Sequence, residues 1–171
     1  MTGKPGLLLV NLGSPDAPTA KAVRKYLFEF LHDKRVIETS RWIWCLILHG
    51  IILRVRPARS ARAYAKVWGD EDGEGPLINI TLQQAAGLSH RLGPDVHVEI
   101  AMRYGNPSIG SGLDKLTSKG CTQIAVLPMY PQFAGATTAS VYDGTVSYTH
   151  LRAHETLRYL VCRLLLEKKK K

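Results

Sequence analysis

Three short loops in the sequence combine residue types that suit a flat, anionic ligand. They run from Leu12 to Asp16, from Arg103 to Pro107 and from Met129 to Thr138, and they are rich in glycine, proline, hydroxyl side chains or tyrosine. Glycine permits close backbone approach to a ligand, tyrosine offers a flat apolar face with a polar tip, and arginine offers a fork that matches a carboxylate. A mostly apolar ligand that carries carboxylates would suit this set.

The same loops also allow plainer interpretations. Arg103 taken alone is more often part of a structural ion pair, and Tyr104 or Tyr130 taken alone is more often a core residue. The first loop and residues 135–138 could also cradle a phosphate, but neither contains the Gly-x-Gly-x-x-Gly or Gly-Lys-Ser/Thr pattern of a nucleotide site. The loops form one site only if the fold brings them together.

Apolar runs before each loop predict the strands that would do this. Residues 6–11 and 124–127 are compact apolar runs that stop at glycine or proline, and in residues 96–102 every second side chain is a large apolar one. Helical segments lie between them, which predicts βαβ units and a parallel three-layer α/β/α sheet with right-handed crossovers. In such a sheet ligands bind at the carboxyl ends of the strands, where all three loops begin.

Helical periodicity fills the sequence between these strands. Helices are expected over residues 19–31, 57–68, 81–92 and 109–116, the first capped by its threonine and the second with a proline in its first turn. The acidic, glycine-rich residues 70–75 predict a turn.

The segment from Trp42 to Leu53 is almost entirely apolar, and four arginines follow it within nine residues. Twelve residues are too few to span a bilayer, which needs about 20. One interpretation is a helix packed on the core or on a second copy of the chain. The other is an interfacial segment whose aromatic face enters lipid while the arginines meet anionic headgroups. Both interpretations stay open here, as does the oligomeric state.

Composition and charge place the chain among ordinary globular proteins. It has 171 residues, of which 45% are hydrophobic and 22% charged, so one domain with a hydrophobic core is expected. The net charge is +9, but residues 146–171 alone carry +5, so a basic tail and not a nucleic-acid-binding domain explains it. Three distant cysteines without a CxxC pair, and an N-terminal apolar run too short for a signal peptide, predict a reducing, cytoplasmic location.

Residues 146–171 differ in style from the rest of the chain. They hold a Leu/Arg-rich run and four terminal lysines, and they are similar to a tail found at the ends of unrelated truncated gene predictions. We therefore expect an α/β domain over residues 1–145 and a tail over 146–171 that is not native to it. A genuine amphipathic helix with a solvated basic end is the alternative.

Collinear motifs extend across most of the chain. They include Asn11-Leu12-Gly13-Ser14-Pro15, Met102-Arg103-Tyr104-Gly105 and Leu127-Pro128-Met129-Tyr130-Pro131-Gln132. From about residue 6 to 141, their order and spacing resemble the N-terminal half of the ferrochelatases, which insert ferrous iron into a porphyrin. The resemblance implies two facing α/β domains with the porphyrin in the cleft between them. It also implies that iron and porphyrin are substrates, and that no cofactor is needed.

Position by position, the resemblance implies a porphyrin site in this half. The residues are Leu12 against the macrocycle, Arg103 and Tyr104 lining the cleft, and Tyr130, Thr137 and Thr138 flanking it. Relatives that act on coproporphyrin tend to have tyrosine at the position of Leu12, so leucine implies protoporphyrin. Ala134 and Ala136 stand where relatives often have serines. Any side-chain hydrogen bond to a propionate from this loop would therefore come from the two threonines.

No catalytic residue and no metal ligand is expected in this half. The family's histidine in a Ser-x-His-Gly-x-Pro context, and a later glutamate, belong to the second half. The run Ser147-Tyr148-Thr149-His150 comes too early and lacks the Gly-x-Pro, and the other histidines have no ligand spacing.

The resemblance therefore implies the N-terminal half of a ferrochelatase that converts protoporphyrin IX to protohaem and is inactive alone. The segment Trp42 to Leu53 adds the expectation of a peripheral contact with the inner membrane. Three alternatives remain. They are a chelatase for cobalt or coproporphyrin, a stand-alone porphyrin-carrying domain, and a basic membrane-associated module without catalysis.

Overall fold

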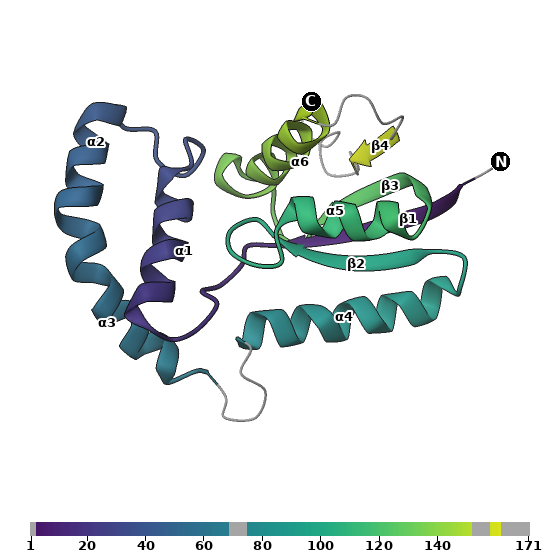
Figure 1. Cartoon of the computed structure of the whole chain (residues 1–171), viewed down its shortest axis with the longest axis horizontal. Coiled ribbons are helices and arrows are strands. Elements are labelled where there is room, and N and C mark those ends of the chain that lie inside the picture. Colours follow the sequence, from purple (N-terminus) through teal and green to yellow (C-terminus); the bar gives the residue numbers. More distant parts are fainter. Residues whose placement is uncertain (1–2, 69–74, 152–157, 162–171) are drawn as a thin grey trace. The chain divides into compact units, whose positions relative to one another are not determined.

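The computed structural model describes residues 3–68, 75–151 and 158–161 (Figure 1). The chain divides into two compact units. The sheet unit contains residues 1–12, 81–103 and 107–171, and the helical unit contains residues 13–80 and 104–106.

The sheet unit is built on four parallel strands in the order β2-β1-β3-β4. The strands are β1 (Lys4–Asn11), β2 (His97–Met102), β3 (Cys121–Pro128) and β4 (Arg158–Val161). The first three are the strands that the apolar runs predict, so the parallel α/β fold is confirmed. The fourth was not expected, because it lies in the segment 146–171, where the sequence predicts no strand.

One face of this sheet carries the main hydrophobic core. Leu8 and Val10 of β1 point to this face with Ile124 and Val126 of β3, as the two-residue period of a strand requires. The helix α5 (Ile109–Ser118) packs here, and α6 (Ser140–Leu151) lies on the same side (Figure 1). The contact is close, since a Cβ added to Gly112 of α5 would lie 2.6 Å from Leu8 Cδ1.

The other face of the sheet is covered in part by α4 (Pro76–Leu92), on the opposite side from α5 in Figure 1. This helix begins five residues earlier than the sequence predicts, and the boundary between the two units falls within it. Thr81 of α4 is fully buried, and its Oγ1 accepts a hydrogen bond of 3.1 Å from Asn11 Nδ2 at the end of β1.

The helical unit contains α1 (Ala20–His32), α2 (Arg41–Ile47), the π-helix η1 (Leu48–Ile52) and α3 (Leu53–Ala65). Thr19 caps α1 as predicted, because its Oγ1 accepts a hydrogen bond from Ala22 N. The apolar side chains Val23, Leu27 and Leu31 of α1 are buried, and α1 packs on α3.

The predicted start of a helix at Pro57 is wrong. Helical structure runs without interruption from Arg41 to Ala65, and Pro57 is the fifth residue of α3. A proline inside a helix removes one backbone donor and disturbs the preceding turn. The π-helical turn immediately before α3 already departs from the regular hydrogen-bond ladder there.

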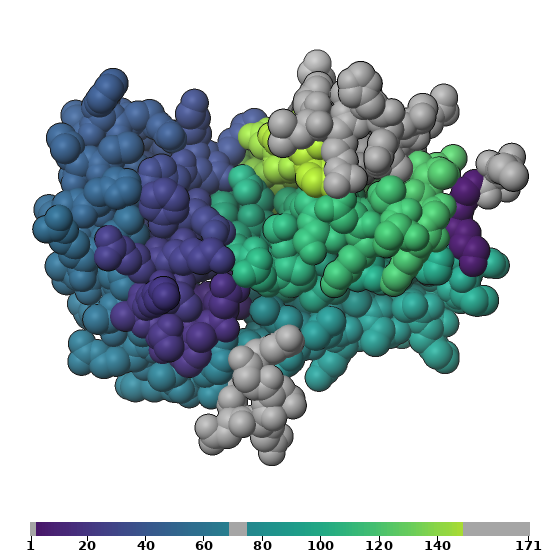
Figure 2. All heavy atoms as spheres, viewed as in Figure 1, coloured from purple at the N-terminus to yellow at the C-terminus, as the bar shows by residue number. Residues whose placement is uncertain are grey.

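The apolar segment within these helices is too short to cross a membrane. None of the helices in the described parts of the chain has an apolar stretch long enough for that. Residues 41–65 lie in the blue part of the space-filling view (Figure 2).

The predicted turn over residues 70–75 falls mostly on residues 69–74, which lie outside the described residues.

Candidate functional site

The loops after β1, β2 and β3 begin at the same edge of the sheet. Arg103 N donates a hydrogen bond of 2.8 Å to Asn11 O, and Met129 N donates one of 2.8 Å to Val10 O. The structure therefore brings the starts of all three predicted loops together in the sheet unit. This is the arrangement that a ligand site at the carboxyl end of a parallel sheet requires.

Leu12 begins the first loop, half-buried, and its backbone is fixed by the preceding residue. Asn11 Oδ1 accepts a hydrogen bond of 2.8 Å from Leu12 N, while the Nδ2 of the same side chain donates to Thr81. The asparagine thus ties the loop to α4. The sequence shows the asparagine, but not its partner 70 residues away.

Arg103 is oriented by the start of α6. Its Nε donates hydrogen bonds to Ser140 O at 2.8 Å and to Ser140 Oγ at 2.7 Å, and Ser140 is fully buried. One position of the guanidinium is therefore committed to the protein, and this fixes the direction of the rest of the group. Nothing in the sequence pairs these two residues, so the role of Ser140 was not predicted.

A cavity of about 760 Å³ opens beside Arg103 between α5 and α6. Its wall includes Lys115, Ser108 and Ser111 of the α5 region and Tyr148 of α6. The hydroxyl of Tyr148 is hydrogen-bonded to Asp114. Arg103 therefore lies beside an open hollow and not within the packed core.

Tyr130 lies partly buried against the main core. Its hydroxyl has no hydrogen-bond partner among the described residues. Burial raises the pKa of this phenol to about 12, against a smaller lowering by the positive charge of Arg103. Tyr130 is therefore a neutral phenol over the physiological pH range, and no described residue accepts a hydrogen bond from its hydroxyl.

The two threonines differ in what their side chains do. They lie in the π-helix η2 (Gly135–Ala139). The Thr137 hydroxyl accepts a hydrogen bond of 3.0 Å from Ala134 N, and it lies 3.1 Å from Ala134 O, to which it donates. Thr138 is 3% exposed. Thr137 thus closes the turn that starts η2, and Thr138 packs inside.

Tyr104 belongs to the helical unit, whereas the other five predicted site residues belong to the sheet unit. It is 2% exposed, its hydroxyl donates a hydrogen bond of 2.8 Å to Asp33 Oδ2, and its ring meets Phe30 edge-on at 5.2 Å. Its placement toward a ligand stays a prediction.

The loop that contains Tyr104 is held by two acidic residues of the helical unit. Gly105 N donates to Glu29 Oε2 at 2.9 Å, and Asn106 Nδ2 donates to Asp16 Oδ1 at 2.9 Å. Gly105 has φ of +83°, and a Cβ there would lie 2.8 Å from Ser14 O. Only glycine fits this position without strain. The glycine is visible in the sequence, but its carboxylate partner is not.

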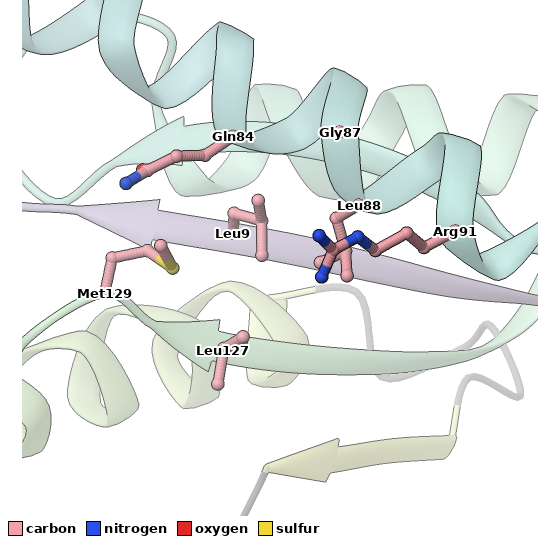
Figure 3. A pocket seen from close by; sticks show the side chains of 7 residues that line it. All are labelled: Leu9, Gln84, Gly87, Leu88, Arg91, Leu127 and Met129. Atoms are coloured by element: carbon pink, nitrogen blue, oxygen red, sulfur yellow. The ribbon is translucent and has the colours of Figure 1, made fainter.

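A second cavity of about 320 Å³ lies between α4 and the sheet (Figure 3). Leu9, Leu127 and Met129 line the sheet side, and Gln84, Gly87, Leu88 and Arg91 line the helix side. Its walls are largely apolar. This cavity marks the part of the sheet face that α4 leaves open.

Metal-binding side chains are not gathered in the described part of the chain. No three histidine, cysteine, aspartate or glutamate side chains there are close enough to hold an ion. His150 lies outside the residues whose side chains the structure describes.

Comparison with known proteins identifies the family. A sequence model of the ferrochelatases matches residues 4–163. The chain belongs to the ferrochelatase family. The predicted resemblance is thereby confirmed, and the match extends into the segment 146–171.

The relatives that match are themselves ferrochelatases by name. Ferrochelatase 2 of Shewanella oneidensis is 54% identical over 144 residues, which are 82% of this chain and 43% of the relative. The ferrochelatase of Polaromonas is 55% identical over 145 residues, which are 83% of this chain and 39% of the relative. The ferrochelatase of Bradyrhizobium is 51% identical over 160 residues, which are 92% of this chain and 46% of the relative. The chain therefore spans less than half the length of these ferrochelatases.

Proposed function

We propose that this chain is the porphyrin-positioning half of an enzyme that inserts ferrous iron into protoporphyrin IX to form protohaem. The observation that carries the proposal is the ferrochelatase match over residues 4–163. Support comes from the sheet edge, where the loops of Leu12, Arg103 and Tyr130 begin together.

The residues at this edge have complementary tasks in the proposal. Leu12 offers an apolar contact to the macrocycle. Arg103, whose Nε is hydrogen-bonded to Ser140, offers the positive charge of its guanidinium to a propionate, and Tyr130 offers a neutral hydroxyl. Iron insertion also needs an acceptor for the pyrrole protons, which we assign to the second half of the enzyme. The contribution of this half is to fix the ring in place.

The proposal is tested by changing Arg103 in a full-length protein that carries this half. Arg103→Ala should weaken porphyrin binding by roughly tenfold to a hundredfold, because a hydrogen bond to a charged group is worth about 1.5–3 kcal/mol. Arg103→Lys should restore only part of the loss, since lysine lacks the guanidinium fork. Quenching of porphyrin fluorescence measures the affinity.

The matched control is Arg62→Ala, which removes an exposed arginine of α3 in the helical unit. Equal affinity of the Arg103→Ala and control proteins for porphyrin would contradict the assignment of Arg103.

A second candidate function, contact with a membrane surface, rests on the exposed face of α2 and η1. Trp42 is 87% exposed, Leu46 77% and Ile51 61%, while Leu48 on the other side is fully buried. An exposed apolar patch of this kind marks a surface for a partner or for lipid. Exposed arginines at positions 54, 56, 59 and 62 of α3 add positive charge next to it.

We infer that this face rests on the cytoplasmic surface of the inner membrane. Addition of anionic vesicles should shift the tryptophan emission to shorter wavelength, and salt should reverse part of the shift by screening the arginines. An unchanged spectrum would leave a second copy of the chain as the partner of this face.

A further inference from the structure

A cavity of about 350 Å³ lies in the helical unit. Its wall is formed by residues of α1, η1 and α3, namely Lys21, Arg24, Lys25, Phe28, His49 and Leu53. At roughly 30 Å³ for each water molecule, it has room for about ten waters, and so for more than a bare anion. The porphyrin-positioning function uses none of these residues.

The rim of this cavity is positively charged. Lys21, Arg24 and Lys25 are spaced at i, i+3 and i+4 on α1, which places them on one face of the helix. All three are exposed, and Lys25 Nζ lies 3.5 Å from the carboxylate oxygen Asp16 Oδ2. Three cations against that one carboxylate leave the mouth with a net positive charge, which favours an anion.

The floor of the cavity is apolar and aromatic. Leu53 is 3% exposed, and the Phe28 ring lies 5.8 Å from the ring of His49 in an edge-on arrangement. A positive rim above an apolar floor suits a ligand with one anionic end and one carbon-rich part. The arginine fork and the two ammonium groups can together donate to several oxygens of one phosphate.

The cavity adjoins the exposed apolar face of α2 and η1. His49, in its wall, lies three residues after Leu46, and side chains at this spacing are neighbours on a helix surface. The same strip continues back by one turn to Trp42. The cavity with the basic rim and the exposed apolar strip therefore lie next to each other on one unit.

We propose that this cavity binds the phosphate headgroup of an anionic glycerophospholipid whose acyl chains lie along the strip of Trp42 and Leu46. The proposal rests on the membrane contact inferred above and adds a defined headgroup site to it. Membrane attachment then depends on lipid type and not only on total charge.

The first test compares two double variants of the full chain that lose the same charge. Lys21→Gln with Arg24→Gln removes two rim cations, and Lys34→Gln with Lys66→Gln removes two exposed lysines of the same unit that do not line the cavity. Sedimentation with phosphatidylcholine vesicles, with and without phosphatidylglycerol, measures binding. The rim variant should bind the anionic vesicles roughly thirtyfold more weakly than wild type, because each of the two lost cations is worth about 1 kcal/mol near such a surface. The control should lose much less.

Each outcome has a separate meaning. Equal loss in the two variants would overturn the headgroup site and leave general charge attraction to the membrane. A Leu46→Asn variant tests the membrane contact itself. If wild type and Leu46→Asn bind the vesicles equally, the apolar strip has no role and the inferred membrane contact is overturned. If wild type binds no anionic vesicles, the contact and the headgroup site are both overturned.

A second measurement needs no variant and so does not depend on the variants folding. Titration of the wild-type chain with the soluble headgroup glycerophosphoglycerol should shift the NMR signals of the His49 ring, while His90 and His97 of the sheet unit serve as internal controls. Shifts absent from His49, or equal at all three histidines, would contradict the proposal. An equal response to inorganic phosphate would identify the site as one for free phosphate and would also overturn the lipid assignment.

Discussion

Single side chains at the sheet edge are restrained to different degrees. Arg103 is fixed through two hydrogen bonds to Ser140, whereas the hydroxyl of Tyr130 is buried with no partner among the described residues. An unpaired buried hydroxyl lowers stability unless a ligand or water satisfies it. A ligand or water that reached the Tyr130 hydroxyl would therefore supply the hydrogen bond that it lacks.

Leu12 tests which porphyrin the site prefers. Leu12→Tyr should move the preference of the full-length enzyme from protoporphyrin toward coproporphyrin, because a phenol at the macrocycle face offers a polar contact that leucine lacks. The ratio of kcat/KM for the two substrates measures the change. An unaltered ratio would remove Leu12 from the specificity determinants.

Tyr130 also predicts how stability depends on pH. A free tyrosine ionises near pH 10, whereas burial raises the pKa of Tyr130 to about 12. Between these values the unfolded chain loses the proton and the folded chain keeps it, so this residue's contribution to stability is complete below pH 10 and falls as pH rises to 12. The Tm of the Tyr130→Phe variant should therefore fall less between pH 10 and 12 than the Tm of wild type. Parallel losses in the two proteins would show that the phenol is not shielded.

At the scale of elements, the packing of α5 on the sheet depends on one small residue. A Cβ added to Gly112 would lie 2.6 Å from Leu8 Cδ1 and 3.2 Å from Ile100 O. A glycine within a helix usually lowers stability. Here it permits the helix to approach β1 and β2 closely, at the centre of the main core.

Two glycine substitutions, in helices on opposite faces of the sheet, should therefore change the free energy of unfolding in opposite directions. Gly112→Ala should lower the free energy of unfolding by about 1–3 kcal/mol through overpacking. Gly87→Ala in α4, where a Cβ would meet nothing within 4 Å, should raise it by about 0.5–1 kcal/mol through helix propensity. Urea titrations measure both. A neutral or stabilising Gly112→Ala would show that α5 can move away from the sheet.

Strands and capped helices were predictable, because their signals are local. Alternation over residues 96–102 and the run at 124–127 predicted β2 and β3, and Thr19 predicted the start of α1. Pro57 led to a wrong helix start, because a proline in a helix ordinarily lies in the first turn. The π-helical turn that precedes α3 has no sequence signal of its own.

Long-range partners were not predictable from the sequence. The bonds from Arg103 to Ser140 and from Gly105 to Glu29 join residues 37 and 76 positions apart. Their geometry depends on the completed fold. The family resemblance indicated candidate porphyrin-binding residues, but it did not indicate what orients each one.

At the scale of the whole molecule, the chain spans less than half the length of the ferrochelatases it matches. It also exposes several large apolar side chains, with Trp42, Leu46 and Val55 each more than half exposed. Such surface promotes association unless a partner or lipid covers it.

The chain of 171 residues should therefore insert no iron by itself and should tend to aggregate. In the proposed function it contributes only groups that position a porphyrin, and the proton acceptor is assigned to the second half of the enzyme. Incubation with protoporphyrin and ferrous iron should leave the free-porphyrin fluorescence unchanged, with light scattering as the measure of association. Iron-dependent loss of fluorescence at an enzymatic rate, from a monomer that melts cooperatively, would refute both parts.

The central place of β1 in the sheet has a consequence for biosynthesis. β1 precedes both of its partners in the chain, and its register with β3 pairs Leu9 with Leu127. At roughly 5–20 residues per second, a ribosome takes on the order of 10 s to make the intervening chain. During that time the apolar run Leu7 to Val10 has no strand to pair with, whereas the helices between residues 20 and 65 are complete much sooner. We therefore expect the β1 segment of the nascent chain to need a holding chaperone, whereas the helices α1 and α3 can form before the sheet does.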